Sequence, residues 1–448
     1  MSLAFVSIAD DDTGASDIAG MLAEAGMRTI VVLDSASQDE LRVWTKNADA
    51  LVFAIASRAL RPEDAYAKTV AALELVRPLQ PQIVGIKYCS TFDSTPQGNI
   101  GPSIEAAMHV LREPFTVAVP ALPVNGRTTY MGYHFVGREL LSDSTMRHHP
   151  LNPMDNPNLV SHLQAQTSRR VGLAAYPAVR AGMNSLKAEL ASLRQAGIEI
   201  AILDCTCNAD LEVICNAISD MPLITGSSGL AMMLPAEWER RGYWMRSDAE
   251  DHGFVRPGSG HGVLVLSGSC SQTTAMQATA FEQLGKPSFV LDGIQLACGN
   301  LDVGGLAGRI VQYLESGTDV VIRTQCEREH VEAVHRWTAR ESLDPIAAGR
   351  RISSALGSIA THVVRHARPE GIVLAGGETS SVVCRMLGVK ALRIGRNIAP
   401  GVPLCTSIEP PRMPFVLKSG NFGGREFFQE AADAIKALPC ASEEVTRS

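Results

Sequence analysis

Short apolar runs alternate along most of the chain with segments of helical length, and this alternation constrains the fold more than any other feature of the sequence. The pattern is typical of strands joined by crossover helices, so it predicts an α/β fold with mainly parallel sheets. In the first half the expected strands are residues 4–9, 29–33, 50–56, 83–87, 115–119 and 198–204, and the expected helices lie near 16–25, 62–77, 101–112 and 181–196.

The alternation stops once, between residues 246 and 261, where the segment RSDAEDHGFVRPGSGH is polar, charged and rich in glycine. Because it carries too little apolar surface to join a core, we expect a linker here. For 448 residues, two α/β domains are then the simplest arrangement, over residues 1–245 and 262–448. The second is expected to hold strands at 263–267, 288–291, 319–323, 371–375, 391–394 and 415–418, helices near 272–284, 345–367 and 379–387, and a final helix.

Composition limits the classes of ligand. The formal net charge is −7, and the mean hydropathy is +0.06. A negative chain has little general affinity for nucleic acid or anionic membranes, while small anionic substrates remain compatible with it. No basic segment followed by an apolar run opens the sequence, and no stretch approaches 18 uninterrupted apolar residues. We therefore expect a cytoplasmic protein that binds neither nucleic acid nor a membrane.

The ten cysteines are scattered along the chain. Cys89 and Cys270 lie next to expected strand ends, and Cys205 and Cys207 form a CxC pair with no second ligand pair. Buried reduced thiols are therefore favoured over a zinc site, and no metal ligand is assigned.

Three consecutive acids, Asp10, Asp11 and Asp12, follow the first expected strand. Ligands bind at this edge of open α/β sheets, and one acid would suffice to cap a helix, so Asp10 and Asp11 are candidate catalytic residues. Simple capping is the alternative. A haloacid-dehalogenase-type phosphatase also carries acids here, but Gly14 stands where its motif has Thr or Val, which disfavours that class.

The segment from Lys87 to Gly101 follows another apolar strand and combines a lysine, several hydroxyls and an acid. Such a loop can bind and deprotonate a polyol, with Asp93 as the proton acceptor. A long turn whose polar side chains satisfy their own backbone is the alternative. The residues expected to bind substrate in this loop are Lys87, Ser90, Thr91 and Ser94.

Arg127 and Arg58 follow two further expected strands, and Asn125 shares the turn of Arg127. A planar guanidinium can donate two parallel hydrogen bonds to a carboxylate, so both arginines are candidate holders of an acidic substrate. Surface arginines without a ligand are the alternative. We group Asn125, Arg127 and Arg58 with the substrate-binding residues.

The second expected domain repeats one kind of turn, in which a strand ends in small residues before a helix. These turns expose backbone N–H groups to an anion, although Gly and Ser also serve turn geometry alone. Neither a Walker P-loop nor a GxGxxG motif after the first strand is present, so ATP would bind by another arrangement and a nicotinamide cofactor is disfavoured. The candidate nucleotide-binding residues are Ser267, Ser269, Gly376, Gly377, Glu378, Thr379 and Gly420.

Seven motifs together resemble the four-carbon acid sugar kinase family, in order and over nearly the whole chain: IADDDTGASD, KYCSTFDSTPQGNIG, PALPVNGRTTYMGY, MRHHPLNPM, VLSGSCSQTT, AGGETSSVV and LKSGNFGG. One departure concerns a lysine that many relatives carry two places before the acid of the second motif. Thr91 stands there in this chain, and Lys87 lies further back.

The resemblance implies an N-terminal domain for the acid sugar, a C-terminal domain for ATP and phosphoryl transfer across the cleft between them, with Mg²⁺ accompanying ATP. The implied acceptor is the C4 hydroxyl of a 3-oxo-tetronate, with D-threonate, D-erythronate and L-threonate as alternatives. A nucleotide-regulated sugar-acid binding protein without turnover is an alternative from another class. The expected partners are a small acid sugar and ATP, and a homo-oligomer is compatible with the family.

Overall fold

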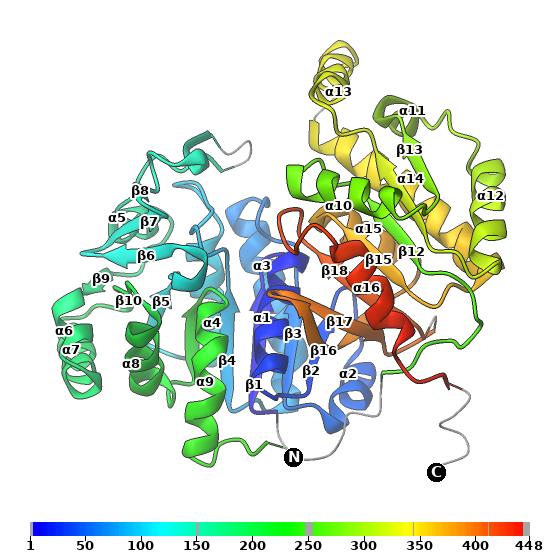
Figure 1. Cartoon of the computed structure of the whole chain (residues 1–448). Coiled ribbons are helices and arrows are strands. Elements are labelled where there is room, and N and C mark those ends of the chain that lie inside the picture. The colour runs from blue at the N-terminus through cyan, green and yellow to red at the C-terminus, as the bar shows by residue number, and fades with distance from the viewer. Residues whose placement is uncertain (1–2, 149–151, 247–253, 344, 411, 442–448) are drawn as a thin grey trace. The chain divides into compact units, whose positions relative to one another are not determined.

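A computed structural model describes residues 3–148, 152–246, 254–343, 345–410 and 412–441. The chain divides into two compact units: unit 1 holds residues 1–32 and 36–248, and unit 2 holds residues 33–35 and 249–448. Part of the expected linker, residues 247–253, lies outside the described residues. Figure 1 traces the chain, and each unit is described separately.

The sheet of unit 1 is parallel throughout, in the order β2-β3-β1-β4-β11-β5-β10-β9. β1, β3 and β4 are buried along their full lengths, as strands covered by helices on both faces must be. The strands are β1 (Phe5–Ala9), β2 (Thr29–Val32), β3 (Ala50–Ala54), β4 (Ile83–Lys87), β5 (Thr116–Val119), β9 (Val171–Ala174), β10 (Ile200–Leu203) and β11 (Leu223–Gly226).

Helices cover both faces of this sheet. On one face, the Phe5 ring of β1 lies 5.3 Å from the ring of Trp238 in α9. On the other, Ile8 lines a pocket together with Thr69 of α3 and Ser103 of α4, as the alternation of side chains along a strand requires. The helices of unit 1 are α1 (Asp12–Glu24), α2 (Gln38–Trp44), α3 (Pro62–Val76), α4 (Ile100–Leu111), α5 (Leu159–Gln164), α6 (Tyr176–Arg180), α7 (Met183–Gln195), α8 (Asn208–Ile218) and α9 (Gly229–Arg240).

A small antiparallel sheet follows β5, built from β6 (Arg127–Tyr130), β7 (Tyr133–Val136) and β8 (Glu139–Leu140). Its first turn places Met131 and Gly132 at φ values of 50° and 78°. The carboxylate of Asp204, directly after β10, accepts hydrogen bonds from both of these amides, at 2.6 and 2.9 Å. A side chain from a distant strand therefore holds the left-handed turn in place.

The sheet of unit 2 has the order β13-β14-β12-β15-β18-β17-β16 and is parallel from β13 to β18. β17 and β16 then pair antiparallel, so the expectation of α/β architecture with mainly parallel sheets is confirmed for both units. The strands are β12 (Leu264–Ser267), β13 (Ser288–Leu291), β14 (Val320–Thr324), β15 (Ile372–Ala375), β16 (Ala391–Ala399), β17 (Val402–Ser407) and β18 (Pro414–Lys418).

On one face of this sheet, Phe281 of α10 and Phe428 of α16 meet edge to face at 6.3 Å between ring centroids and join a core with Val265 and Val373. α14 packs against α11, α12, α13 and α15 away from that core. The helices of unit 2 are α10 (Gln272–Gln283), α11 (Gly293–Cys298), α12 (Val303–Glu315), α13 (Arg328–Arg340), α14 (Pro345–Ala367), α15 (Gly377–Met386) and α16 (Phe427–Lys436).

Candidate functional sites of the two units

At the carboxyl end of β1, two of the three acids pair with Arg58. Both carboxylate oxygens of Asp10 accept hydrogen bonds from this guanidinium, from Nε and Nη2, each at 2.8 Å. Nη1 lies 2.8 Å from Oδ2 of Asp11, whose Oδ1 caps α1 by accepting the amide of Gly14. Burial alone would lower the pKa of Arg58, but the two carboxylates raise it well above its ordinary value. Arg58 as a holder of the substrate stays a prediction, and this pairing does not favour it.

Lys87 and Asp17 form a second group of charged residues at the carboxyl end of the unit 1 sheet, beside α1. Lys87, the last residue of β4, reaches over Gly14, where a Cβ would clash with its Nζ. Asp17 accepts a 2.6 Å hydrogen bond from the Ser228 hydroxyl. Burial raises the pKa of Asp17, and the nearby Lys87 charge partly opposes this. Asp17 and Ser228 were not predicted as site residues, although Asp17 closes the acidic first motif.

The loop after β4 presents Asp93 through a strained residue. Phe92, directly before it, has φ of 54°, a left-handed conformation that is uncommon for an aromatic residue. The Phe92 ring is held between Tyr88 and His162, at centroid distances of 5.2 and 6.0 Å. Asp93 itself is 4% exposed. The buried ring thus fixes the backbone that positions Asp93, whose catalytic role stays a prediction.

The hydroxyls of this loop differ in their burial and in the number of hydrogen bonds that they form within the protein. Ser94 is fully buried, and its Oγ lies 3.0 Å from the Phe92 carbonyl, 3.1 Å from His162 Nε2 and 2.9 Å from Gln166 Nε2. Thr91 is buried, with its Oγ1 3.0 Å from the Cys89 thiol, whereas Ser90 is partly exposed. Substrate binding by these residues stays a prediction, and for Ser94 the geometry favours a structural role.

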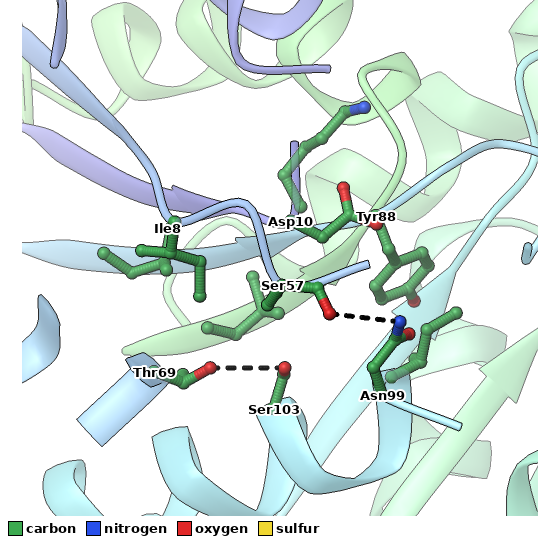
Figure 2. Close-up of a pocket in the computed structure, with 11 residues that line it drawn as sticks. Ile8, Asp10, Ser57, Thr69, Tyr88, Asn99 and Ser103 are labelled. Atoms are coloured by element: carbon green, nitrogen blue, oxygen red, sulfur yellow. Dashed lines mark hydrogen bonds between the residues drawn. The ribbon is translucent and has the colours of Figure 1, made fainter. Parts of the chain in front are cut away.

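A small pocket lies at this edge of the sheet, lined by Asp10, Tyr88, Asn99 and Ser57 among others (Figure 2). Asn99 donates hydrogen bonds to the carbonyl oxygens of Ser57, at 3.4 Å, and of Arg58. The Ser57 hydroxyl is buried and has no hydrogen-bond partner among the described residues. A buried hydroxyl of this kind can serve a bound ligand, yet Ser57 was not predicted as a site residue.

Arg127, at the start of β6, differs from Arg58 in its partners. Its Nη1 donates to the carbonyl of Asn125, an exposed residue, and its buried Nε has no acceptor among the described residues. No carboxylate in the described ranges forms an ion pair with it. Burial lowers the pKa of the neighbouring His134 to about 4, with a backbone contact to Ser90 opposing and the Arg127 charge adding to the shift. His134 itself is held by the Thr129 hydroxyl, which lies 3.0 Å from its Nδ1.

In unit 2, three of the strand-end turns approach one another. A Cβ on Gly376, which has φ of +117°, would lie 3.3 Å from the Ser269 amide nitrogen. A Cβ on Gly420 would lie 2.6 Å from Ser269 Oγ. Glycine is thus needed where the turns approach each other. The carbonyl of Gly420 accepts hydrogen bonds from the hydroxyls of Ser271 and Thr274, at 2.5 and 2.7 Å.

Lys418, the last residue of β18, completes this cluster. It is 1% exposed, and its Nζ donates to Thr274 Oγ1 at 2.9 Å and to the Gly420 carbonyl at 3.1 Å. Burial lowers the pKa of Lys418 to about 8, and no described carboxylate forms an ion pair with it. Lys418 was not predicted as a site residue, although a lysine ending an apolar strand occurs twice, here and at Lys87.

The remaining candidates surround the same turns. Ser267 ends β12 and Thr379 lies in the first turn of α15, both buried. Gly377 is the first residue of α15. Glu378 is exposed, and its partial desolvation raises the pKa of its carboxyl group despite the charge of Arg350. Nucleotide binding by these residues stays a prediction.

Within the described ranges, no group of three or more His, Cys, Asp or Glu side chains is arranged to hold a metal ion. Cys205 is buried and Cys207 exposed, and burial raises the pKa of the Cys205 thiol. Among the described helices, none has the length and apolar character needed to cross a membrane.

Comparison with known proteins gives matches over nearly the whole chain. Residues 5–234 match the sugar-binding N-terminal domain family, and residues 264–428 match the nucleotide-binding C-terminal domain family. A 3-oxo-tetronate kinase of Pseudomonas fluorescens is 40% identical over 95% of both chains, and one of Salmonella typhimurium is 38% identical over 95% of this chain and 97% of its own.

Two solved structures share the fold. A Salmonella typhimurium protein superposes with a TM-score of 0.82 at 35% identity, covering 95% of this chain and 98% of its own. A Haemophilus influenzae protein gives 0.78 at 34% identity, covering 96% of this chain and 100% of its own.

Proposed function

The chain belongs to the four-carbon acid sugar kinase family, and on that premise we propose that it transfers a phosphoryl group from ATP to the C4 hydroxyl of 3-oxo-tetronate. Relatives of that name, about 40% identical over 95% of the chain, support this substrate. The observation that carries the proposal is the meeting of three glycine- and serine-rich turns beside Lys418 in unit 2.

The cluster in unit 2 fits the phosphates of ATP. α10 and α15 both begin at these turns, and helix N-termini offer free N–H groups and a partial positive charge to an anion. Gly376 and Gly377 allow an oxygen to approach the backbone more closely than a Cβ would permit. Lys418 adds a positive charge that no described carboxylate neutralises. When bound, ATP supplies the phosphoryl group, while this chain holds and orients it.

Unit 1 would bind the acid sugar. Arg127 and Lys87 make no ion pair with a carboxylate among the described residues, so their charges remain available to the substrate carboxylate. Ser57 offers a buried hydroxyl at the pocket of Figure 2. Because Arg58 occupies both oxygens of Asp10, Asp93 is the better candidate to orient and deprotonate the C4 hydroxyl.

Mg²⁺ would accompany ATP. Since the described residues include no cluster of three metal-ligating side chains, the phosphate oxygens would supply much of its coordination. Glu378, exposed at the start of α15, is the nearest acid by sequence to the expected phosphate site.

The test is release of ADP from purified full-length protein with ATP, Mg²⁺ and, in turn, 3-oxo-tetronate, D-threonate, D-erythronate and L-threonate. We expect the highest kcat/KM with 3-oxo-tetronate and a product that mass spectrometry identifies as its 4-phosphate. A higher value with another acid would assign the chain to a sister activity. Calorimetric binding of both ligands without ADP release would instead indicate a binding protein.

A further inference from the structure

Two cysteines of unit 2 occupy equivalent positions after neighbouring strands. In the parallel pair of β12 and β14, Ser267 is the register partner of Arg323. Cys270 follows Ser267 by three residues, and Cys326 follows Arg323 by three residues. Because paired strands run roughly 4.8 Å apart, the two chains leave the sheet side by side and bring these cysteines to the same place.

Side-chain contacts support this placement. The Cys326 thiol donates to the Ser269 carbonyl at 3.3 Å, the group bonded to the nitrogen of Cys270. It also lies 3.2 Å from the carbonyl of Thr324. The Cys326 sulfur is therefore in contact with the peptide group that leads into Cys270. Cys270 is exposed and Cys326 partly exposed, so both are open to a small solute.

The surroundings give the two sulfurs different acidities. The neighbouring Cys270 thiol lowers the pKa of Cys326 to about 7; burial opposes this shift, while Thr324 and the charge of Arg323 add to it. Glu327 is the facing acid and raises the pKa. The pKa of Cys270 is raised, first by the neighbouring Cys326. Cys326 is thus the more acidic of the two thiols, and the thiolate is the form that reacts with oxidants.

We propose that Cys270 and Cys326 form a peroxide-sensitive dithiol that closes to a disulfide beside the nucleotide site. The Cys326 thiolate attacks hydrogen peroxide, which breaks the O–O bond, oxidises the sulfur to sulfenic acid and releases hydroxide. The Cys270 thiol then displaces the sulfenic oxygen as water, so that two thiols are oxidised and one peroxide is reduced. A small thiol reductant reverses the reaction by disulfide exchange.

The disulfide would act on nucleotide binding, a consequence that rests on the proposed function of unit 2. Cys270 stands between Ser269 and Ser271, whose side chains contact the Gly420 turn. Drawing Cys270 towards the end of β14 shifts both serines and the amides at the start of α10. Loss of a single hydrogen bond to a charged phosphate lowers affinity about tenfold or more.

The first experiment tests the modification alone. The reduced full-length protein is treated with hydrogen peroxide, its remaining thiols are alkylated, and its peptides are mapped without reductant. We expect a Cys270–Cys326 crosslink whose rate rises with pH through about 7. In Cys270→Ser the resolving thiol is missing, so dimedone should trap sulfenic acid on Cys326. The control is Cys298→Ser, because Cys298 is an exposed cysteine outside this pair. Oxidation of Cys298 as fast as Cys326, or no crosslink, would overturn the proposal.

The second experiment separates the modification from its effect. Calorimetry with ATP should give an affinity at least about tenfold lower for the crosslinked protein than for the reduced one, with recovery after dithiothreitol. Cys298→Ser should behave as wild type, whereas Cys270→Ser, which cannot form the crosslink, should keep its ATP affinity after treatment with peroxide alone. A crosslinked protein with unchanged affinity would overturn the regulatory role. Failure of the reduced protein to bind ATP would instead contradict the proposed function.

Discussion

Lys418 allows a sharp test, because its expected effects on stability and on nucleotide binding have opposite signs. The ammonium is almost fully buried and makes no ion pair with a described carboxylate. Its pKa is lowered by burial to about 8. A charge held in this way costs stability in the free protein but attracts an anion. Lys418→Met keeps the length of the side chain and removes the charge.

The size of the effect follows from the pKa. A shift from the ordinary 10.5 to about 8 corresponds to about 3 kcal/mol of unfavourable free energy for the protonated form. Methionine loses the hydrogen bonds to Thr274 and Gly420, at about 1 kcal/mol each. The Gly420 carbonyl keeps its bonds from Ser271 and Thr274. We therefore expect Lys418→Met to be more stable than wild type by about 1 kcal/mol, a rise of roughly 2–4 °C in Tm.

The dependence on pH gives the argument a second check. Below pH 8 the lysine is protonated in both the folded and the unfolded state, so the full cost is present. Between pH values of about 8 and 10.5 the folded state has lost the proton while the unfolded state still binds it, so wild-type stability rises with pH. The stability advantage of Lys418→Met should therefore shrink over this range, as followed by thermal unfolding at several pH values.

In contrast to its stability, the affinity of Lys418→Met for ATP should be lower than that of wild type. Calorimetry with ATP at pH 7 should show about ten- to a hundred-fold weaker binding in Lys418→Met, the effect of losing a charged hydrogen bond. Wild-type affinity should fall as pH rises through 8 and beyond, while the variant shows little dependence. Lys87→Met is the matched control, since Lys87 also ends a buried strand but lies in unit 1. It should keep ATP binding and lose affinity for the acid sugar.

One combination of results would refute this reasoning. If Lys418→Met is less stable than wild type at pH 7 and binds ATP with unchanged affinity, Lys418 only ties β18 to α10. The phosphate site would then need another source of positive charge.

Three further predictions concern the two sites. Asp93→Asn should lower kcat about 10²-fold or more with ATP affinity nearly unchanged. If Asp17→Asn instead gives the larger loss of kcat, the general base lies on α1. Coupled ADP-release kinetics of the two variants decide between these outcomes. Arg127→Ala should raise KM for the acid sugar about ten- to a hundred-fold. Arg58→Ala should instead cost about 3–5 kcal/mol of stability, because it leaves two carboxylates unpaired. An Arg58→Ala protein with wild-type thermal stability and a raised KM would contradict these separate roles. Gly377→Val should remain folded, lose ATP binding in calorimetry and still bind the acid sugar, and retained ATP affinity would move the phosphates away from α15.

Hydrophobic alternation was enough to find most of the central strands of each sheet, although β11, which is buried between β4 and β5, was not among the expected strands. β1, β4 and β15 lie where their apolar runs placed them, because a parallel strand buried on both faces must be apolar throughout. The antiparallel strands β6, β7 and β8 were not predicted. β6 reads RTTY and is only partly buried, so its sequence lacks the apolar signal, and its turn depends on the distant carboxylate of Asp204.

In the candidate sites too, local sequence predicts some features and long-range contacts determine the others. That Ser269, Gly376 and Gly420 approach one another follows from local sequence, since small residues at the carboxyl ends of parallel strands share one edge of a sheet. Local sequence does not reveal which side chains hold these turns in place by hydrogen bonds. Lys418 and Thr274, which lie 144 residues apart, both donate a hydrogen bond to the Gly420 carbonyl, and the pattern of small residues at the strand ends identifies neither of them.

Arg58 and Arg127 show why a charged residue cannot be assigned from its own neighbourhood. Both follow a strand of unit 1, and both have the chemistry to hold a carboxylate. Arg58 meets Asp10 across 48 residues of chain, and this long-range pair occupies both oxygens of the acid. Arg127 starts a strand whose nearby partner is the neutral backbone of Asn125. A guanidinium satisfied by the protein's own acids fixes the site's shape, whereas one without such acids retains charge for a ligand. The division between stability and KM in the two alanine variants therefore follows from which acids the fold brings to each arginine.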